Sequence, residues 1–443
     1  MRVAHITAGA AGMYCGACIH DNTLAAALMR RGVDVALVPT YTPLRTDETD
    51  VSMKQVFYGG IGVFLEQKLP PFRRMPRFVD WALRRPALLK GVSRFSGATQ
   101  PGDLGALTVS VLRGPEGHQR RELERLVEWL RADFRPDIVL LTNSLFLGLA
   151  GKLKSVLGVP VVCAVQGEEI FLEGLVEPFR SEALNLLRER AADAAGFVAP
   201  CRYAADFMSR YLEVERNRFH VVPLGLHLSG HGEGEAAAPP SAESPFTIGF
   251  LARICPDKGL HVLAEAFAHL AEERGAETVR LLAAGWLGDG DRPYLREVEE
   301  TLRRAGLAGR FEYRGVLDRT QKIRFLRELH VLSVPAPFRE PKGLYVLEAL
   351  ANGVPVVQPD HGAFPELIEA TGGGLLAEGA RAEAVAAGIG RLIDDEALRQ
   401  RLAASGSEAV RERFSDDVMA AGTHALFERF VPSRRSVHRE EIA

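Results

Sequence analysis

The stretch VLSVPAPFREPKGLYVLEALANGVPVVQP, residues 331–359, contains a strand pattern, a helix pattern and a second strand pattern in that order. Its first and last runs are short, apolar and rich in valine, whereas the apolar residues between them recur at helical spacing. Strands of this kind that alternate with helices are typical of a parallel sheet covered on both faces. The stretch therefore predicts a strand–helix–strand unit, in which Glu340 and Glu348 lie on either side of Gly343.

The same alternation continues along the chain. Strand-like runs in the first half occupy residues 3–7, 34–40, 137–143, 159–165, 196–200 and 219–225. After residue 245 the pattern restarts, with FTIGFLA, VRLLAAG and RFEYRG as further strands between amphipathic helices. The sequence therefore predicts an α/β protein with two Rossmann-like, doubly wound parallel sheets.

The length of 443 residues is too great for one ordinary core, so two domains are expected. Residues 228–245, LSGHGEGEAAAPPSAESP, are rich in Gly, Ala, Pro and Ser without periodicity, which indicates a linker or an exposed loop. The predicted organisation is an N-terminal domain at 1–227 with an insertion at 65–117, a C-terminal domain at 246–414, and a returning C-terminal helix with a tail at 415–443.

Composition and charge exclude several classes of protein. A hydrophobic content of 47% with 25% charged residues is typical of a globular chain, and a net charge of -3 gives no reason to expect nucleic acid. No run approaches the ~20 apolar residues of a membrane span. The first residues lead directly into strand-like sequence instead of a signal peptide, so we expect a cytoplasmic protein.

Residues 71–95 do not fit the alternation, because they hold seven Lys or Arg against one Asp, with aromatic residues between them. One interpretation is a patch that contacts the inner membrane face or an acceptor. The other is an inserted pair of helices with inward aromatics and a solvated basic face. Pro76 and Pro86 would break a long amphipathic helix and favour the second interpretation.

Cys15 and Cys18 form a CxxC pair. A redox or metal role would need a thioredoxin-like context or a second pair of ligands, and the sequence shows neither. We therefore interpret both as small residues of a Gly-rich loop, and no Asp-x-Asp pair at a strand end indicates a metal site.

Two cations follow the first strand of the second half, in GFLARICPDKG. Arg253 and Lys258, with Gly259 at the start of a helix, suit a diphosphate, because fixed positive charges and backbone N–H groups offset its charge without a metal. Two surface cations are the alternative. Glu340 and Glu348 add carboxylates that accept hydrogen bonds from hydroxyls, so the combination predicts a site for a molecule with hydroxyls and phosphates, such as a nucleotide sugar.

EPKGLYVLEALANGVPVV resembles the E-x7-E motif of GT-B glycosyltransferases of family 4, the retaining glycosyl transferases group 1. The resemblance extends to the Gly-rich loop after the first strand, HVVPLG, GFLARICPDKG and HGAFPELIEATGGGLL. It implies two Rossmann-like domains that face a central cleft. It also implies a hexosyltransferase that uses a UDP- or GDP-sugar with retention, without a cofactor or metal.

The resemblance also implies roles for individual residues. Glu340 would bind hydroxyls of the donor sugar and Glu348 the ribose hydroxyls. Arg253 and Lys258 would hold the diphosphate and stabilise it as it leaves. Further donor contacts are implied for Lys342, Gly343, Leu344, Gly12 and Gly16.

Gln166 departs from the family pattern, since members commonly have a histidine there. A glutamine can hydrogen-bond a hydroxyl but cannot take a proton, which agrees with a mechanism in which the leaving phosphate receives it. Gln166 and Glu168 either contact the acceptor or sugar, or serve as a capping amide and a surface acid. Lys342, where many relatives have glycine, either adds a charge near the phosphates or faces solvent.

The acceptor is not identified by the sequence, and a carbohydrate, a lipid-linked molecule and a small molecule all remain open. A catalytically inactive nucleotide-sugar-binding protein of the same fold is the alternative to an enzyme, because of Gln166. An epimerase or phosphorylase would need a different catalytic set.

Overall fold

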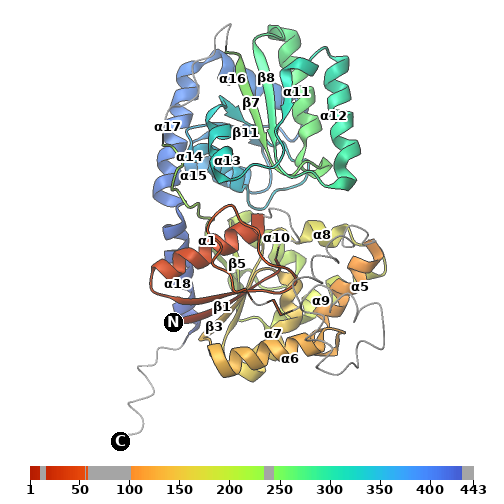
Figure 1. The fold of residues 1–443 in the computed structure, drawn as a ribbon, viewed down its shortest axis with the longest axis vertical. Coiled ribbons are helices and arrows are strands. Elements are labelled where there is room, and N and C mark those ends of the chain that lie inside the picture. The colour runs from red at the N-terminus through yellow and green to blue at the C-terminus, as the bar shows by residue number, and fades with distance from the viewer. Residues whose placement is uncertain (10–15, 55, 58–100, 234–243, 432–443) are drawn as a thin grey trace, which may run out of the picture. The chain divides into compact units, whose positions relative to one another are not determined.

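The computed structural model describes residues 1–9, 16–54, 56–57, 101–233 and 244–431 (Figure 1). The chain divides into two compact units. The first contains Met1–Pro223 and Met419–Ala443, and the second contains Leu224–Val418. Each unit is built around one parallel sheet, which confirms the predicted fold class of two doubly wound, Rossmann-like sheets.

The sheet of the first unit has six strands in the order β2-β1-β3-β4-β5-β6. The strands are β1 (Arg2–Thr7), β2 (Asp34–Pro39), β3 (Ile138–Leu141), β4 (Val161–Ala164), β5 (Gly196–Ala199) and β6 (Phe219–Val221). All neighbours pair in parallel. The strand order changes direction between β1 and β3, and in such sheets ligands bind where the order reverses, at the carboxyl ends of the strands.

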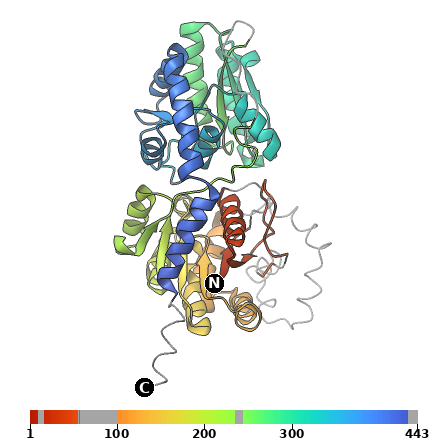
Figure 2. The same ribbon diagram turned by 90° about the vertical axis from the view of Figure 1, so that its left-hand side faces the viewer.

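The helices of the first unit are α1 (Gly16–Arg30), α5 (Pro101–Leu112), α6 (Arg120–Trp129), α7 (Leu147–Leu157), α8 (Glu169–Glu173), α9 (Phe179–Arg190), α10 (Arg202–Tyr211) and most of α18 (Asp416–Phe430). In α18, Met419, Ala420 and Phe427 belong to one buried cluster with Val3 of β1 and Leu24 of α1. Figures 1 and 2 show α18 (blue) beside α1 (red). The end of the chain therefore completes the core of the first unit.

The second sheet also has six strands, in the order β12-β11-β10-β7-β8-β9. They are β7 (Phe246–Leu251), β8 (Val279–Ala284), β9 (Phe311–Tyr313), β10 (Val331–Leu332), β11 (Val356–Pro359) and β12 (Gly374–Ala377). Its helices are α11 (Leu260–Arg274), α12 (Arg292–Arg304), α13 (Arg319–Arg327), α14 (Leu344–Ala351), α15 (Phe364–Thr371), α16 (Ala382–Asp394) and α17 (Glu396–Arg413). Here the strand order reverses between β7 and β10.

Residues 228–245 were expected to be a linker or an exposed loop; residues 228–233 and 244–245 of this segment are described, and residues 228–233 form turns in which Ser229, Gly232 and Glu233 are exposed. His231 is completely buried, and its Nδ1 lies 2.8 Å from Nδ2 of Asn352. The backbone carbonyl oxygens of His227 and His231 accept hydrogen bonds from Arg319 and Arg411. Composition alone does not reveal such partners, and His231 anchors this otherwise largely exposed loop to the second unit.

The predicted insertion at 65–117 is described from residue 101 onward. Its described part forms α5 and a short 3-10 helix, Gly114–Glu116, and Gly105 of α5 packs closely against Phe179 of α9. The basic and aromatic segment 71–95 lies outside the described residues. After α14, Gly353 adopts the left-handed conformation with φ 72°, whereas Asn352 has φ -98°.

Candidate functional site

The reversal point of the second sheet brings together the loops that contain the predicted donor-binding residues. β7 and β10 are hydrogen-bonded neighbours, with Ile248 opposite Val331. The loop after β7 contains Arg253 and Lys258, and the loop after β10 contains Glu340. Because both loops leave the same edge of the sheet, side chains that are 82 positions apart in the sequence meet there.

Lys258 and Glu340 form a buried ion pair at this edge. Nζ of Lys258 lies 2.5 Å from Oε2 of Glu340, and the side chains are only 15% and 6% exposed. Oε1 of Glu340 accepts a hydrogen bond from the backbone N–H of Lys342 at 3.3 Å. Burial alone would raise the pKa of Glu340, but the charges and hydrogen bonds of Lys258 and Lys342 outweigh it and lower the pKa. Glu340 is therefore a carboxylate at neutral pH.

The position of Lys258 follows from the local backbone. It ends a 3-10 helix, Pro256–Lys258, and the next residue, Gly259, has φ 76°. A Cβ on Gly259 would lie 2.0 Å from the carbonyl oxygen of Pro335, in the loop after β10. Only glycine allows this left-handed turn and this close approach of the two loops.

Arg253 lies close to the end of β7 and is exposed. Within the described part of the chain it has no hydrogen bond or ion pair. The structure therefore brings Lys258 and Glu340 into contact, and it leaves Arg253 on the same loop with its charge directed to solvent.

Glu348, the second glutamate of the motif, is buried on α14 and forms an ion pair with Lys322 of α13. Both residues are less than 9% exposed. Asn352 adds to the framework, because its Nδ2 donates to the backbone oxygen of Glu348 at 2.8 Å. Sequence reasoning missed Lys322, since a single lysine within a helical run has no motif to distinguish it from a surface cation.

Gly343 precedes α14 with φ 72°, and Leu344 and Tyr345 form the first turn of the helix, where backbone N–H groups have no partner within the helix. A Cβ on Gly343 would lie 2.8 Å from Cδ1 of Leu367, so the missing side chain makes room for α15. Lys342, one residue earlier, is half-buried.

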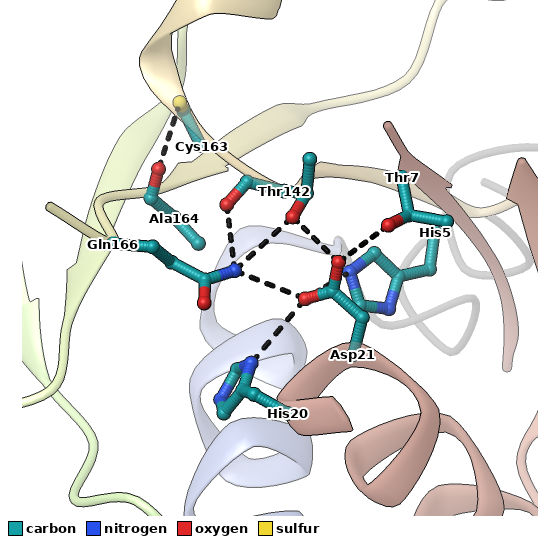
Figure 3. A network of polar contacts seen from close by, with 8 residues as sticks. All are labelled: His5, Thr7, His20, Asp21, Thr142, Cys163, Ala164 and Gln166. Atoms are coloured by element: carbon teal, nitrogen blue, oxygen red, sulfur yellow. Dashed lines mark hydrogen bonds and ion pairs between the residues drawn. The ribbon is translucent and has the colours of Figure 1, made fainter. Parts of the chain in front are cut away.

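The first unit has its own polar group at the point where its strand order reverses (Figure 3). Asp21 of α1 lies at its centre. Its Oδ2 accepts hydrogen bonds from Thr7 at 2.6 Å and Thr142 at 2.5 Å, which end β1 and follow β3. Its Oδ1 accepts one from Nε2 of Gln166 at 3.0 Å, in the loop after β4.

Two histidines complete the surroundings of Asp21. Nδ1 of His20 lies 3.3 Å from Oδ1 of Asp21, and Nε2 of His5 lies 3.4 Å from it, outside hydrogen-bond geometry. Burial alone would raise the pKa of Asp21, but the charge of His5 and the contacts with both histidines lower it far below its usual range. Sequence reasoning missed Asp21, because it lies among other polar residues, His20, Asn22 and Thr23, in a helical run with no motif to single it out.

Gln166 and Glu168 are both buried. The amide Nε2 of Gln166 donates to Thr142 as well as to Asp21. Oε1 of Glu168 accepts from the backbone N–H of Ser144 at 2.9 Å, and Oε2 accepts from that of Gln166 at 2.7 Å. The alternative of a surface acid is therefore wrong for Glu168, which joins the loops that follow β3 and β4.

The remaining candidates are only partly described. Gly12 and Cys15 lie outside the described residues. Gly16 is exposed and is the first residue of α1, and Cys18 is buried in the same helix. Among the described residues, no group of three or more His, Cys, Asp or Glu side chains is arranged to hold a metal ion. None of the described helices has the length and hydropathy needed to cross a bilayer.

Two family models match consecutive parts of the chain. Residues 20–225 match the glycosyl transferase 4-like domain, and residues 233–409 match the glycosyl transferases group 1. Among curated relatives, a D-inositol 3-phosphate glycosyltransferase of Xylanimonas cellulosilytica is 32% identical over 52% of this chain and 55% of the relative. One of Segniliparus rotundus is 28% identical over 74% of this chain and 71% of the relative.

A phosphatidyl-myo-inositol mannosyltransferase of Mycobacterium leprae is 31% identical over 43% of this chain and 48% of the relative. The matches span about half the length of most of these curated relatives. Solved structures match nearly end to end. Anabaena HepE, solved with UDP and glucose, has a TM-score of 0.65 at 17% identity, covering 97% of this chain and 100% of that one. Sucrose-phosphate synthase from Thermosynechococcus elongatus has a TM-score of 0.68, covering 97% and 98%.

Proposed function

The chain belongs to the glycosyl transferases of group 1, the family-4 enzymes with the GT-B fold, and from this premise we propose that it transfers a hexose from a nucleoside diphosphate sugar to an acceptor hydroxyl. We propose further that the sugar keeps its anomeric configuration and that no metal is needed. The single observation that supports this best is the buried Lys258–Glu340 pair at the carboxyl ends of β7 and β10.

The proposed roles follow from the chemistry of these groups. The Lys258 ammonium has three N–H donors and Glu340 accepts one of them, so the others can donate to the donor's phosphate oxygens. Arg253, exposed on the same loop, would add a second charge. The Glu340 carboxylate would accept hydrogen bonds from sugar hydroxyls, while Glu348 would bind the ribose hydroxyls.

In the proposed reaction, the bond between C1 of the sugar and the diphosphate oxygen breaks, and a bond from C1 to the acceptor oxygen forms on the same face. The acceptor's proton passes to the departing phosphate oxygen. Negative charge grows on the diphosphate during this step, so a fixed ammonium stabilises the transition state more than the bound donor. Gln166, which cannot take a proton, has no acid–base role in this scheme.

The acceptor that we propose to test first is an inositol phosphate. Several curated relatives are named D-inositol 3-phosphate glycosyltransferases, and another is named for phosphatidyl-myo-inositol. Carbohydrates and lipid-linked molecules are the acceptors to test next.

The test is a binding and turnover assay with purified protein. We expect UDP- or GDP-sugars to raise the melting temperature, because a ligand of the native state stabilises it, and we expect slow donor hydrolysis and faster transfer with the right acceptor. The variant Arg303→Ala should bind and turn over the donor as the wild-type protein does, because this cation pairs with Glu300 on the exposed face of α12. Activity in EDTA equal to that without it would support the metal-free proposal, and loss of activity would overturn it.

The alternative is a protein that binds nucleotide sugars without turnover, which Gln166 makes worth testing. It would show donor binding by calorimetry but neither hydrolysis nor transfer with any acceptor class. NMR of the product decides the stereochemistry, since an inverted anomeric centre would contradict retention.

A further inference from the structure

The side chain of Tyr345 has a buried hydroxyl that the roles above do not use. Tyr345 is the second residue of α14 and is 9% exposed, and within the described part of the chain its hydroxyl makes no hydrogen bond of ordinary geometry, although it lies beside the Glu340 carboxylate. Leaving a buried hydroxyl unpaired is unfavourable, so such groups are rare unless they serve a ligand.

The surroundings of Tyr345 indicate which ligand group the hydroxyl meets. Side chains at the start of a helix tilt toward its N-terminus, where the unpaired backbone N–H groups of α14 lie. Nζ of Lys258 lies 6.0 Å from the centroid of the Tyr345 ring and 4.8 Å from that of Phe338. The Tyr345 ring, and the Glu340 carboxylate beside its hydroxyl, are therefore close to the ammonium to which we assign the diphosphate.

We propose that the Tyr345 hydroxyl donates a hydrogen bond to a phosphate oxygen of the donor, which makes Tyr345 a further donor-binding residue. This inference rests on the proposed function, because it places the diphosphate beside Lys258. The diphosphate would then accept hydrogen bonds from three kinds of group: the ammonium of Lys258, the backbone N–H groups at the start of α14, and the phenol of Tyr345.

The ionisation of the phenol agrees with a role as a hydrogen-bond donor. Burial first, and then the negative charge of Glu340 and the contact of its carboxylate with the phenol, raise the pKa of Tyr345 well above its usual value. The phenol therefore keeps its proton at any pH at which the protein is assayed. Its effect on binding should not change between pH 6 and pH 9, a range that lies wholly below the ordinary pKa of about 10 for a tyrosine.

Tyr345→Phe tests the proposal, because it removes only the hydroxyl. Without ligand, we expect the melting temperature to stay the same or rise, since an unpaired buried hydroxyl contributes nothing favourable. With UDP, we expect the Kd measured by calorimetry to rise about tenfold or more, as for a lost hydrogen bond to a charged group.

Tyr313→Phe is the matched control. The Tyr313 hydroxyl donates to the carbonyl oxygen of Gly285 at 2.7 Å, so this change should lower the melting temperature and leave the UDP affinity unchanged. The opposite pattern in the two variants separates a ligand-binding hydroxyl from a structural one.

Two outcomes would overturn the inference. An unchanged UDP affinity in Tyr345→Phe, with wild-type affinity measurable, would contradict it while leaving the proposed function intact. A clear drop in the melting temperature of ligand-free Tyr345→Phe would show that the hydroxyl is paired within the protein. Failure of the wild-type protein to bind any nucleotide sugar would instead contradict the proposed function.

Discussion

Both units have a buried carboxylate where the strand order of a parallel sheet reverses, but the carboxylates differ in what surrounds them. Asp21 in the first unit is held by two threonine hydroxyls, an amide and two histidines. Glu340 and Glu348 in the second unit each face a lysine. Each threonine hydroxyl has one proton, and donating it to Asp21 leaves none for a ligand. A lysine ammonium has three N–H donors, so it can bind a carboxylate and still donate to a ligand. The first arrangement therefore fixes loops, and the second is suited to binding an anion.

The largest effect is expected from Glu340→Gln, which keeps the shape of the side chain and removes its charge. We expect kcat/KM to fall by about 10²–10³, as when a group that stabilises a transition state is removed. Glutamine is a better test than alanine, because Glu340 is buried against Lys258 and truncation would leave both a cavity and an unpaired ammonium.

Glu300→Gln is the control for Glu340→Gln, since Glu300 lies in an exposed ion pair with Arg303. Its activity should equal that of the wild-type protein. A Glu340→Gln variant with a near-normal rate would mean that the second unit does not hold the reacting sugar where we propose.

In the first unit the expected effect is on stability. The Asp21 carboxylate contacts five polar side chains, and Asp21→Asn removes its negative charge. We therefore expect a loss of about 2–3 kcal/mol in the free energy of unfolding. Asp34→Asn is the control, because its pair with Arg2 is exposed and such pairs contribute little. Chemical denaturation measures both, and equal losses would show that Asp21 is not the centre of the group.

The contribution of Asp21 should also depend on pH in a defined direction. Its pKa in the folded state is lowered, so its charge stabilises the fold fully above the unfolded value of about 3.9. This stabilisation is lost as the pH falls toward the lowered value. The difference between wild type and Asp21→Asn should therefore shrink below about pH 4.

The sequence was sufficient for the sheets because continuous apolar strands have a pattern that does not depend on distant contacts. It missed β12, Gly374–Ala377, since three consecutive glycines disfavour a strand and only pairing with β11 forms it. It also made β10 too long: residues 331–337 fit a strand, but only Val331–Leu332 form one.

The candidate site was predictable where a motif fixed the spacing, as for Glu340 and Lys258. It was not predictable where a partner came from an unrelated helix, as Lys322 and Asp21 did. Glu168 shows the same limit, because a pattern cannot tell a solvated acid from one that accepts two backbone N–H bonds across two loops.

A smaller effect is expected from Lys322→Met, which tests whether the second ion pair serves the donor. Glu348 would lose its ion pair with Lys322, which favours the charged form of a buried carboxylate, so it would accept fewer hydrogen bonds from ribose. We expect the KM for the donor to rise about tenfold with little change in kcat, and Lys322→Arg to restore most of the loss. A 2′-deoxyribose donor should show a smaller penalty, and an equal penalty would contradict the ribose assignment.

The smallest effect separates two roles of glycine in the second unit. Gly343 and Gly353 both have φ 72°, but a Cβ on Gly343 would meet Leu367, whereas a Cβ on Gly353 would meet nothing within 4 Å. Gly353→Ala should lower the free energy of unfolding by about 1 kcal/mol, the cost of an alanine in the left-handed conformation. Gly343→Ala should lower it by about 1 kcal/mol more, because its Cβ would crowd Leu367. If Gly343 makes room for α15, its variant should still bind UDP with nearly wild-type affinity. A variant as stable as Gly353→Ala that no longer binds UDP would instead show that the glycine makes room for the donor.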